Sequence, residues 1–266
     1  MNVIQIRDLD FNYNKKVIFE KLNLSFEESK RYVICGLNGT GKSTLLKIIG
    51  GKTLCPFDSV SVLDCDPFRN TSSNINIAYL NNDWGTKTVA FTGYNMLIQS
   101  DIKVKDMMKN LKITYPERNE ELIRVLSINE EWNMNSISEG QRKRVQLYLG
   151  LIQPFKICLL DEITTNLDIL VKHSFMQYLK KESVEQKACI LYVTHIFDGL
   201  EEWCTDIVYF NHNKQIESFP YKHDKPIYNL LLDRMINEES NEDEHCIPSY
   251  TKNAGGFTHG VLIEYT

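Results

Sequence analysis

Apolar and polar residues alternate through much of residues 3–26, and a turn-prone Asn12-Tyr13-Asn14 interrupts the alternation. A period of two turns successive side chains to opposite faces of a strand, so this region is predicted to form antiparallel strands. A short apolar run at residues 32–35 then stops at a glycine, and residues 43–49 carry apolar side chains at helical spacing. The predicted order is strand, glycine-rich loop, helix.

Helical spacing returns between residues 103 and 126, where Tyr115-Pro116 breaks the pattern, and it predicts a small helical insert. Residues 157–160 and 189–193 are fully apolar, which is typical of strands buried on both faces, and helical stretches precede both. The sequence therefore predicts an α/β fold with a mostly parallel sheet. After about residue 220 the composition turns polar and acidic, so residues 221–266 are predicted to form a partly ordered tail.

Composition places the chain among folded globular proteins. Of 266 residues, 42% are hydrophobic and 24% are charged, which suits one large α/β domain with a small appendage. No apolar run approaches the roughly 18 residues that a membrane span needs, and the N-terminus lacks a signal peptide's apolar region. The seven cysteines include no CxxC pair, so neither a disulfide framework nor a zinc site is predicted, and a cytoplasmic or nuclear location is expected. The net charge of -5 argues against direct nucleic-acid binding.

Residues 36–43 read GLNGTGKS and match the phosphate-binding pattern G-x-x-x-x-G-K-[ST] between a strand and a helix. Glycines let backbone N–H groups approach phosphates, and a helix N-terminus favours their negative charge. Lys42 is predicted to reach the β and γ phosphates of ATP, and Ser43 to bind Mg²⁺. The predicted nucleotide-binding residues of this segment are Gly36, Asn38, Gly39, Thr40, Gly41, Lys42, Ser43 and Thr44. A glycine-rich turn without a ligand is the alternative.

Two carboxylates follow the apolar run at residues 157–160. Asp161 is predicted to hold the water shell of Mg²⁺, and Glu162 to orient or polarise the water that attacks the γ phosphate. Adjacent acids can also be an ordinary polar step out of a sheet. Their position well downstream of a phosphate-binding loop favours the functional interpretation.

The segment Ser138-Glu139-Gly140-Gln141-Arg142 lies shortly before these acids and introduces an amphipathic stretch. Alone it could be only a helix N-terminus capped by Ser138. In sequence order, however, the phosphate-binding loop, Ser-x-Gly-Gln, Leu-Leu-Asp-Glu, Asn166-Leu167-Asp168 and Thr194-His195 resemble the motif set of ABC ATPases, over roughly the first 220 residues.

This resemblance implies a P-loop NTPase with a RecA-like core, an antiparallel β subdomain and a helical signature subdomain. The ATP-binding domain would occupy residues 1–220, with the helical insert at about residues 100–150, followed by the tail. Tyr13 falls where the family stacks an aromatic ring on adenine, and Gln99 where a glutamine contacts Mg²⁺ or the attacking water. His195 stands in place of the histidine that contacts the γ phosphate.

The resemblance also implies a dimer. Ser138 and Gly140, with Gln141 beside them, would bind the γ phosphate of ATP held by the loop of an opposite domain, and Asp168 resembles the aspartate that communicates across the dimer. The chain has one phosphate-binding loop and one such signature, so two complete sites need two chains. A homodimer, or a head-to-tail pair with a related ABC domain, is therefore expected.

A closer resemblance to one ABC group lies in four segments, residues 138–147, 154–156, 158–162 and 194–201. Together they look like the small soluble ABC group of fungi and plants, the CCR-associated-factor type or non-intrinsic subfamily I. Members have no membrane domain, and the fungal type is associated with a transcription and mRNA-deadenylation regulatory complex, which suggests such a partner here. Two residues depart from the common ABC pattern: Glu139 replaces a glycine and Ile163 a proline. Glu139 adds a charge near the opposite γ phosphate, which bears on how tightly the dimer closes, and an acidic residue at this position looks usual for the soluble group.

The leading function is thus an ATPase whose ATP-closed dimer acts in a regulatory complex. A second interpretation makes the chain the ATPase subunit of a membrane transporter, whose membrane protein would contact the helical insert. A third is a scaffold that binds ATP with little hydrolysis, although Glu162 and His195 argue against it. Phosphate transfer to a small molecule is a fourth, which would leave the signature residues without a role.

Overall fold

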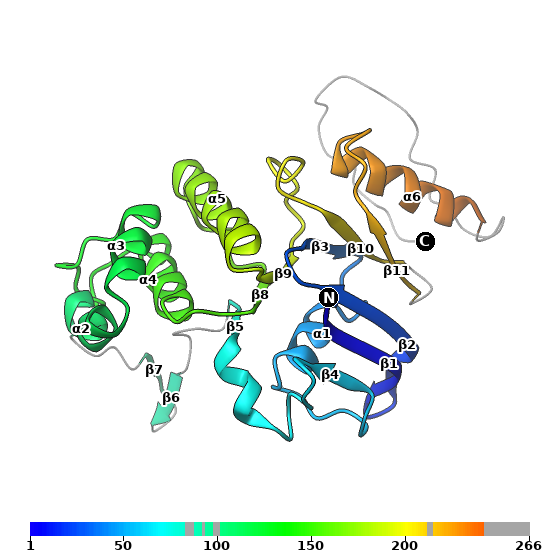
Figure 1. Ribbon diagram of the computed structural model, residues 1–266, viewed down its shortest axis with the longest axis horizontal. Helices are drawn as coiled ribbons and strands as arrows, with labels where there is room; N and C mark the ends of the chain where they lie inside the picture. The colour runs from blue at the N-terminus through cyan, green and yellow to red at the C-terminus, as the bar shows by residue number, and fades with distance from the viewer. Residues whose placement is uncertain (83–87, 92–93, 98–101, 212–214, 242–266) are drawn as a thin grey trace, which may run out of the picture.

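The computed structural model describes residues 1–82, 88–91, 94–97, 102–211 and 215–241. Figure 1 shows an N-terminal antiparallel sheet on one side, a central α/β layer, and a group of helices at the opposite end. The long strands of the antiparallel sheet and the helical group therefore lie on different sides of the central layer. This arrangement confirms the predicted α/β class with separate antiparallel and helical parts.

The N-terminal sheet follows from the alternation at the start of the chain. Its strands, in the order β2-β1-β4, are β2 (Lys16–Glu27), β1 (Asn2–Tyr13) and β4 (Val60–Val62). Along β1 the side chains of Ile4, Ile6, Leu9 and Phe11 are buried. The period of two breaks between Ile6 and Leu9, and the register with β2 shifts at the same place. The bulge thus keeps both apolar sets on the buried face.

The central sheet has six strands in the order β11-β10-β3-β9-β8-β5. The pairs β10–β3, β3–β9, β9–β8 and β8–β5 are parallel, and only β11 pairs antiparallel, with β10. This confirms the mostly parallel sheet, while the antiparallel edge strand was not predicted. The strands are β3 (Arg31–Gly36), β5 (Ile77–Leu80), β8 (Ile157–Asp161), β9 (Cys189–Val193), β10 (Asp206–Phe210) and β11 (Ile216–Pro220).

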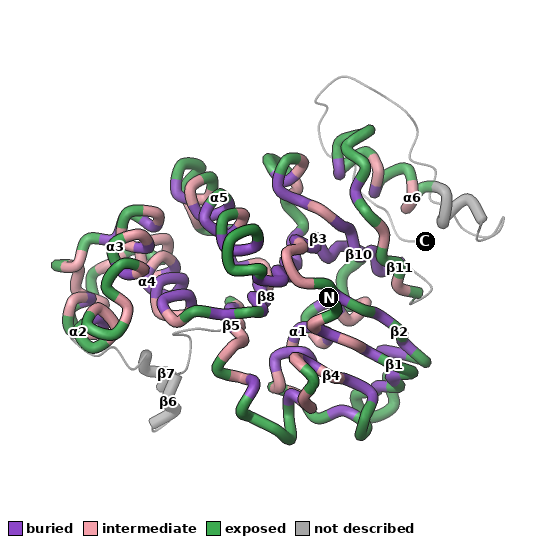
Figure 2. Tube along the Cα trace, viewed as in Figure 1, coloured by how far each residue is buried: buried purple, intermediate pink, exposed green. Residues whose placement is uncertain are grey.

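Helices and the N-terminal sheet bury both faces of the central strands, as Figure 2 shows by the continuous buried stretch through the sheet. Helix α1 (Lys42–Ile49) packs in one core with the N-terminal sheet, and α5 (Ile169–Glu185) packs in a second core on the other face. In β8, Leu159 belongs to the first core and Leu160 to the second. Burial on both faces explains why these strands read as uninterrupted apolar runs.

Three helices, α2 (Val104–Thr114), α3 (Pro116–Val125) and α4 (Glu139–Leu151), form the helical part (Figure 1). The remaining elements are η1 (Thr71–Asn76), β6 (Thr88–Phe91), β7 (Tyr94–Leu97) and, near the C-terminal end, α6 (Ile227–Asn241). Pro116 opens α3, where its missing N–H costs no helical hydrogen bond, so the predicted break falls between α2 and α3. Ile227 and Leu231 anchor α6 in the core that contains α5. The division of the chain at residue 220 stays a prediction.

Among the helices in the described part of the chain, none is both long and apolar enough to cross a membrane.

A buried ion pair fastens the helical part to the central layer. The two terminal nitrogens of Arg118 in α3 donate to the two carboxylate oxygens of Glu182 in α5, at 2.8 and 2.9 Å. Its Nε donates to the Leu151 carbonyl at 2.8 Å, and the side chains of Arg118 and Glu182 are only 15% and 5% exposed. Each charge is expensive to bury without the other, so the pair ties α3 to α5.

The substitution Glu182→Ala should therefore lower the free energy of unfolding by about 3 kcal/mol or more, because it leaves the Arg118 guanidinium buried without its counter-charge. Urea denaturation followed by circular dichroism measures the loss. Glu131→Ala is the matched control, since Glu131 pairs with Lys105 on the surface and is 61% exposed. Equal losses in the two variants would contradict the structural role given to Glu182.

Candidate functional site

The loop after β3 has backbone positions that only glycine adopts easily. The φ angles are 135° at Gly36, 77° at Gly39 and 110° at Gly41. A Cβ on Gly36 would lie 2.2 Å from the carbonyl oxygen of Phe210, and one on Gly41 would lie 2.7 Å from Cγ2 of Ile18. The glycines thus bring the loop main chain directly against β10 and β2, where a side chain would clash.

Lys42 begins α1, whose N-terminal N–H groups are not capped by any described side chain. The Lys42 side chain is nearly buried, and its Nζ donates to the carbonyl oxygens of Gly36 at 2.8 Å and Leu37 at 2.7 Å. Burial lowers the pKa of this ammonium group, and the nearby carboxylates of Glu162 and Asp161 oppose that shift. A buried cation beside an uncapped helix N-terminus favours an anionic ligand.

Three adjacent strand ends supply the other polar groups. Ser43 Oγ donates to Asp161 Oδ1 at 3.0 Å, which joins the start of α1 to the end of β8. Beyond β8, Glu162 Oε1 lies 3.1 Å from Nε2 of His195, just after β9, and the Glu162 N–H donates to the Val193 carbonyl at 3.0 Å. A hydroxyl beside a carboxylate suits Mg²⁺, which binds through few protein oxygens and keeps most of its waters.

A cavity of about 300 Å³ opens beside these groups. Tyr13, 44% exposed, stands at the cavity with its ring edge-to-face on Phe11 at 5.0 Å between centroids. Thr40 turns back into the loop instead, and its Oγ1 donates to the Leu37 carbonyl at 2.8 Å. The described lining residues are Tyr13, Lys16, Ile18, Asn38, Gly39, Gly41, Lys42, Ser43, Thr44, Glu162 and His195. The structure therefore brings together most of the residues predicted to hold ATP.

The signature residues lie apart from this cavity within one chain. Ser138 caps α4: its Oγ accepts from the Gln141 N–H at 3.2 Å, while Gln141 Oε1 accepts from the Ser138 N–H at 2.9 Å. The helix-cap interpretation of this segment is therefore correct, and it does not exclude a second role. Ser138, Gly140 and Gln141 are absent from the described lining of the cavity, as expected if they serve a neighbouring chain.

The segment after Glu162 packs against the start of α4. Asn166 Nδ2 donates to Glu139 Oε1 at 2.5 Å, and a Cβ on Gly140 would lie 2.9 Å from the Asn166 carbonyl oxygen. Asp168 forms an ion pair with Arg144, and its Oδ1 accepts from the Val171 N–H at 2.9 Å as the cap of α5. The Glu139 carboxylate, expected to face a neighbouring phosphate, is thus bonded within its own chain.

Gln99 lies outside the residues that the structure describes, so its predicted contact with Mg²⁺ or water stays a prediction. A residue that sequence reasoning missed is Asn82, shortly after β5. Its Nδ2 lies 3.4 Å from the Glu162 carbonyl oxygen and its Oδ1 accepts from Lys143 Nζ at 2.7 Å. The sequence holds part of the information that would have pointed to Asn82, because Asn81-Asn82 are the first polar residues after the apolar end of β5.

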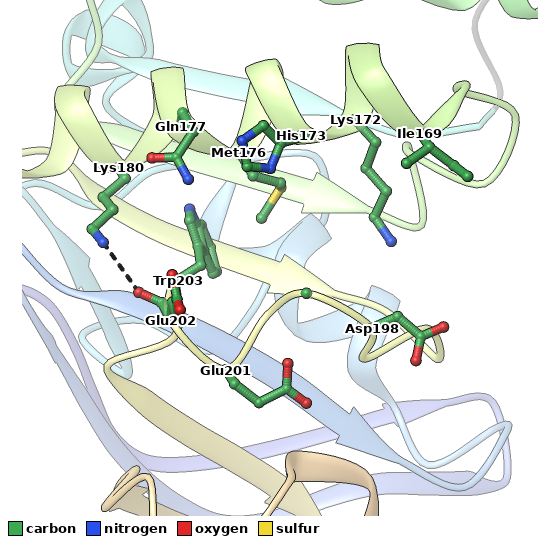
Figure 3. A pocket seen from close by; sticks show the side chains of 11 residues that line it. Ile169, Lys172, His173, Met176, Gln177, Lys180, Asp198, Glu201, Glu202 and Trp203 are labelled. Carbon is green, nitrogen blue, oxygen red and sulfur yellow. Dashed lines mark hydrogen bonds between the residues drawn. The ribbon is translucent and has the colours of Figure 1, made fainter.

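A second cavity, of about 620 Å³, lies between α5 and residues 198–203 (Figure 3). Lys172 and His173 project from α5 on one wall, and Asp198 and Glu201 lie on the opposite wall, over a floor that contains Trp203. Its described lining shares no residue with the 36–43 loop. This cavity is larger than the one beside the 36–43 loop, yet the phosphate-binding geometry selects the smaller of the two.

Comparisons with known proteins agree with the geometry. Residues 19–165 match the family model described as ABC transporter. ABC transporter I family member 20 of Arabidopsis thaliana is 39% identical over 88% of this chain and 75% of its own length. CCR4-associated factor 16 of Saccharomyces cerevisiae is 32% identical over 83% of this chain and 80% of its own length.

Solved structures show the same fold at low identity. The structure described as the ATP binding subunit of an ABC transporter has a TM-score of 0.71 at 19% identity, and covers 90% of this chain and 99% of its own. The dimeric post-hydrolysis state of the ATP-binding cassette MJ0796, bound to ADP and Pi, has a TM-score of 0.64 at 19% identity, over 82% of this chain and 99% of its own. The resemblance predicted from the motifs is confirmed: the chain belongs to the ABC transporter family of ATP-binding domains, in the group that includes the Arabidopsis I-family members and yeast CCR4-associated factor 16.

Proposed function

We propose that the chain binds ATP with Mg²⁺ in the cavity beside the 36–43 loop and hydrolyses it as an ATP-gated dimer. The observation that carries this proposal is the convergence of Ser43–Asp161 and Glu162–His195 at one edge of the sheet, next to Lys42. Binding groups and a candidate base thus lie around a single cavity. A scaffold without hydrolysis would not need the second pair.

Binding is assigned to the loop, α1 and Tyr13. The exposed ring of Tyr13 offers a flat apolar surface for adenine, and the loop N–H groups with Lys42 attract the phosphates. The Ser43 hydroxyl and the Asp161 carboxylate would hold Mg²⁺, which when bound offsets phosphate charge. Asn38, Gly39 and Thr44 complete the lining around the phosphates.

Hydrolysis is assigned to Glu162 with His195. In this step water forms a bond to the γ phosphorus while the bond to the ADP oxygen breaks. Glu162 orients the water and accepts the proton that the water loses, and His195 Nε2 lies close enough to the carboxylate, at 3.1 Å, to fix its position. The Glu162 N–H bond to Val193 holds its main chain at the end of β8, so the carboxylate stays near the cavity.

The dimer is assigned to the surface that carries the signature. Ser138 and Asp168 are exposed, and Asp168 is followed by Ile169 and Leu170, which are 86% and 79% exposed. Two large apolar side chains next to each other on the surface favour a protein contact there. Dimeric structures of the MJ0796 cassette, which has the same fold, support a second chain as the partner. In this arrangement Ser138, Gly140 and Gln141 would contact the nucleotide of that chain.

Glu162→Gln should lower steady-state phosphate release at least about 100-fold, because the amide cannot accept a proton from water. ATP binding should remain, so the variant should accumulate as a dimer when ATP is present, measured by light scattering after gel filtration. Lys42→Ala is the contrasting variant: it should weaken ATP binding itself and give no such dimer. A Glu162→Gln protein that hydrolyses ATP at the wild-type rate would remove this residue from its role.

The regulatory role is proposed from the relative named CCR4-associated factor 16, which is 32% identical to this chain. In this role the ATP-bound dimer would associate with a transcription or mRNA-regulatory complex, and hydrolysis would release it. The alternative, a subunit of a membrane transporter, is supported by relatives such as the methionine import ATP-binding protein MetN of Clostridium tetani, at 26% identity.

Affinity purification of Glu162→Gln from cell extract with ATP separates these roles. The regulatory role predicts that components of an mRNA-regulatory complex co-purify with Glu162→Gln without detergent. The same components should be absent when Lys42→Ala is purified in its place. Co-purification of an integral membrane protein after detergent extraction, with the chain itself in the membrane fraction, would instead support the transporter role and contradict the regulatory one.

A further inference from the structure

Helix α4 is bound by side chains to the loops that follow two strands of the sheet. Lys143 Nζ donates to Asn82 Oδ1 at 2.7 Å, and Gln146 Nε2 donates to the Asn81 carbonyl at 2.7 Å, both in the loop after β5. Arg144 pairs with Asp168 in the loop after β8. The helix that carries the signature is thus attached to the edge of the sheet where the candidate site lies.

Asn82 connects this helix to the candidate catalytic residue. A side-chain amide has a carbonyl that only accepts and an NH₂ group that only donates. The Asn82 side-chain carbonyl accepts a hydrogen bond from the Lys143 ammonium. The NH₂ group of Asn82 therefore points toward the Glu162 carbonyl oxygen, which lies 3.4 Å away. The ammonium therefore determines the orientation of the amide, because the reversed amide would place two donors together.

The Glu162 main chain is held from both sides. Its N–H donates to the Val193 carbonyl of β9. Its carbonyl oxygen lies 3.4 Å from Asn82 Nδ2 and 3.3 Å from Thr165 Oγ1. Glu162 also has a φ of 52°, which is uncommon for a residue with a side chain. Such a backbone conformation persists where its surroundings fix it, so groups that hold the carbonyl also set where the carboxylate points.

Burial makes the Lys143 contact strong enough to matter. Lys143 is 7% exposed, and a buried ammonium needs acceptors to replace its water. Asn82, by contrast, is exposed and can be changed with little effect on packing. A shift of α4 would move the buried ammonium, the amide bound to it and then the carbonyl of Glu162.

We infer that Asn82 and Lys143 are positioning residues, which transmit the placement of the signature helix to the carboxylate of Glu162. The inference rests on the proposed hydrolysis and adds a route by which α4 controls it. Neither residue is among the described groups that line the ATP cavity, so the pair affects the chemical step and leaves ATP binding unchanged. A second chain that contacts Ser138 on the same helix would act on Glu162 through these two side chains.

The test is the steady-state ATPase activity of a variant series. Asn82→Ala and Lys143→Met should each lower kcat about tenfold or more, because misplacing a reacting group by a fraction of an ångström is costly, and should leave KM for ATP within about twofold. The double variant should be no worse than the poorer single variant, since both remove one route. Asn82→Asp keeps an acceptor for Lys143 but loses the donor to Glu162, so it should be as slow as Asn82→Ala.

Two controls separate this role from a structural one. Lys112→Met removes a partly buried lysine of α2 that pairs with Glu130, in the same helical part, and should keep wild-type kcat. Lys143→Arg retains a cationic donor and should recover part of the activity lost in Lys143→Met. Thermal unfolding of every variant gives the stability, and the exposed Asn82 series decides the outcome if Lys143→Met does not fold.

The inference is overturned if wild-type protein hydrolyses ATP, Glu162→Gln does not, and the Asn82 variants retain kcat within about twofold. Additive losses in the double variant, or losses that follow stability alone, also overturn it. Failure of the wild-type protein to hydrolyse ATP is a different result, because it rejects the proposed function itself.

Discussion

The pairing of β9 with both β3 and β8 is the constraint on which the candidate site depends. Val193, the last residue of β9, pairs with Ile34 of β3 on one side and with Asp161 of β8 on the other. All three strands are parallel, so the loops that follow them start together at one edge of the sheet. The contacts of Ser43 with Asp161 and of His195 with Glu162 are consequences of this register. A shift of one residue would move a loop by about 3.3 Å and separate these groups.

Apolar alternation cannot set this register, because the central strands are apolar on both faces. Polar residues at the strand ends do so instead. At the amino end of β3, the buried Arg31 donates through Nε to the Trp203 carbonyl and through Nη1 to Ser183 Oγ, both at 2.6 Å. At the carboxyl end of β8, the carboxylates of Asp161 and Glu162 must leave the core, since burying an unpaired carboxylate is costly. Fixed ends thus hold apolar strands that could otherwise slide.

The sequence predicted best what is encoded locally. The loop at residues 36–43, the acids at the end of β8 and His195 after β9 each follow an apolar run, so their places at strand ends could be inferred from order alone. The fold class followed from the same runs. The antiparallel strand β11 was missed because its pairing depends on β10 rather than on any pattern of its own.

What the sequence did not reveal depends on contacts between distant segments. The place of Gln99 at the entry to the helical insert predicts a contact with Mg²⁺ or water that stays untested, whereas no sequence motif indicated Asn82. The contact of Asn82 with Glu162 depends on β5 lying next to β8, and no local pattern shows that pairing. The same is true of Glu139: as a sequence feature it is a charge in the signature, and its bond to Asn166 becomes visible only when the segments meet.

This bond changes how closure of a dimer should be understood. Glu139 and Arg144 attach the first turns of α4 to Asn166 and Asp168, so the signature turn and the segment after Glu162 form one surface within a chain. A surface whose parts are already fixed loses less conformational entropy when a second chain docks on it. The carboxylate of Glu139 is also occupied by a donor, which reduces its repulsion toward a phosphate. Closure would then depend on the position of α4 relative to the 36–43 loop, and less on rearrangement of the signature turn itself.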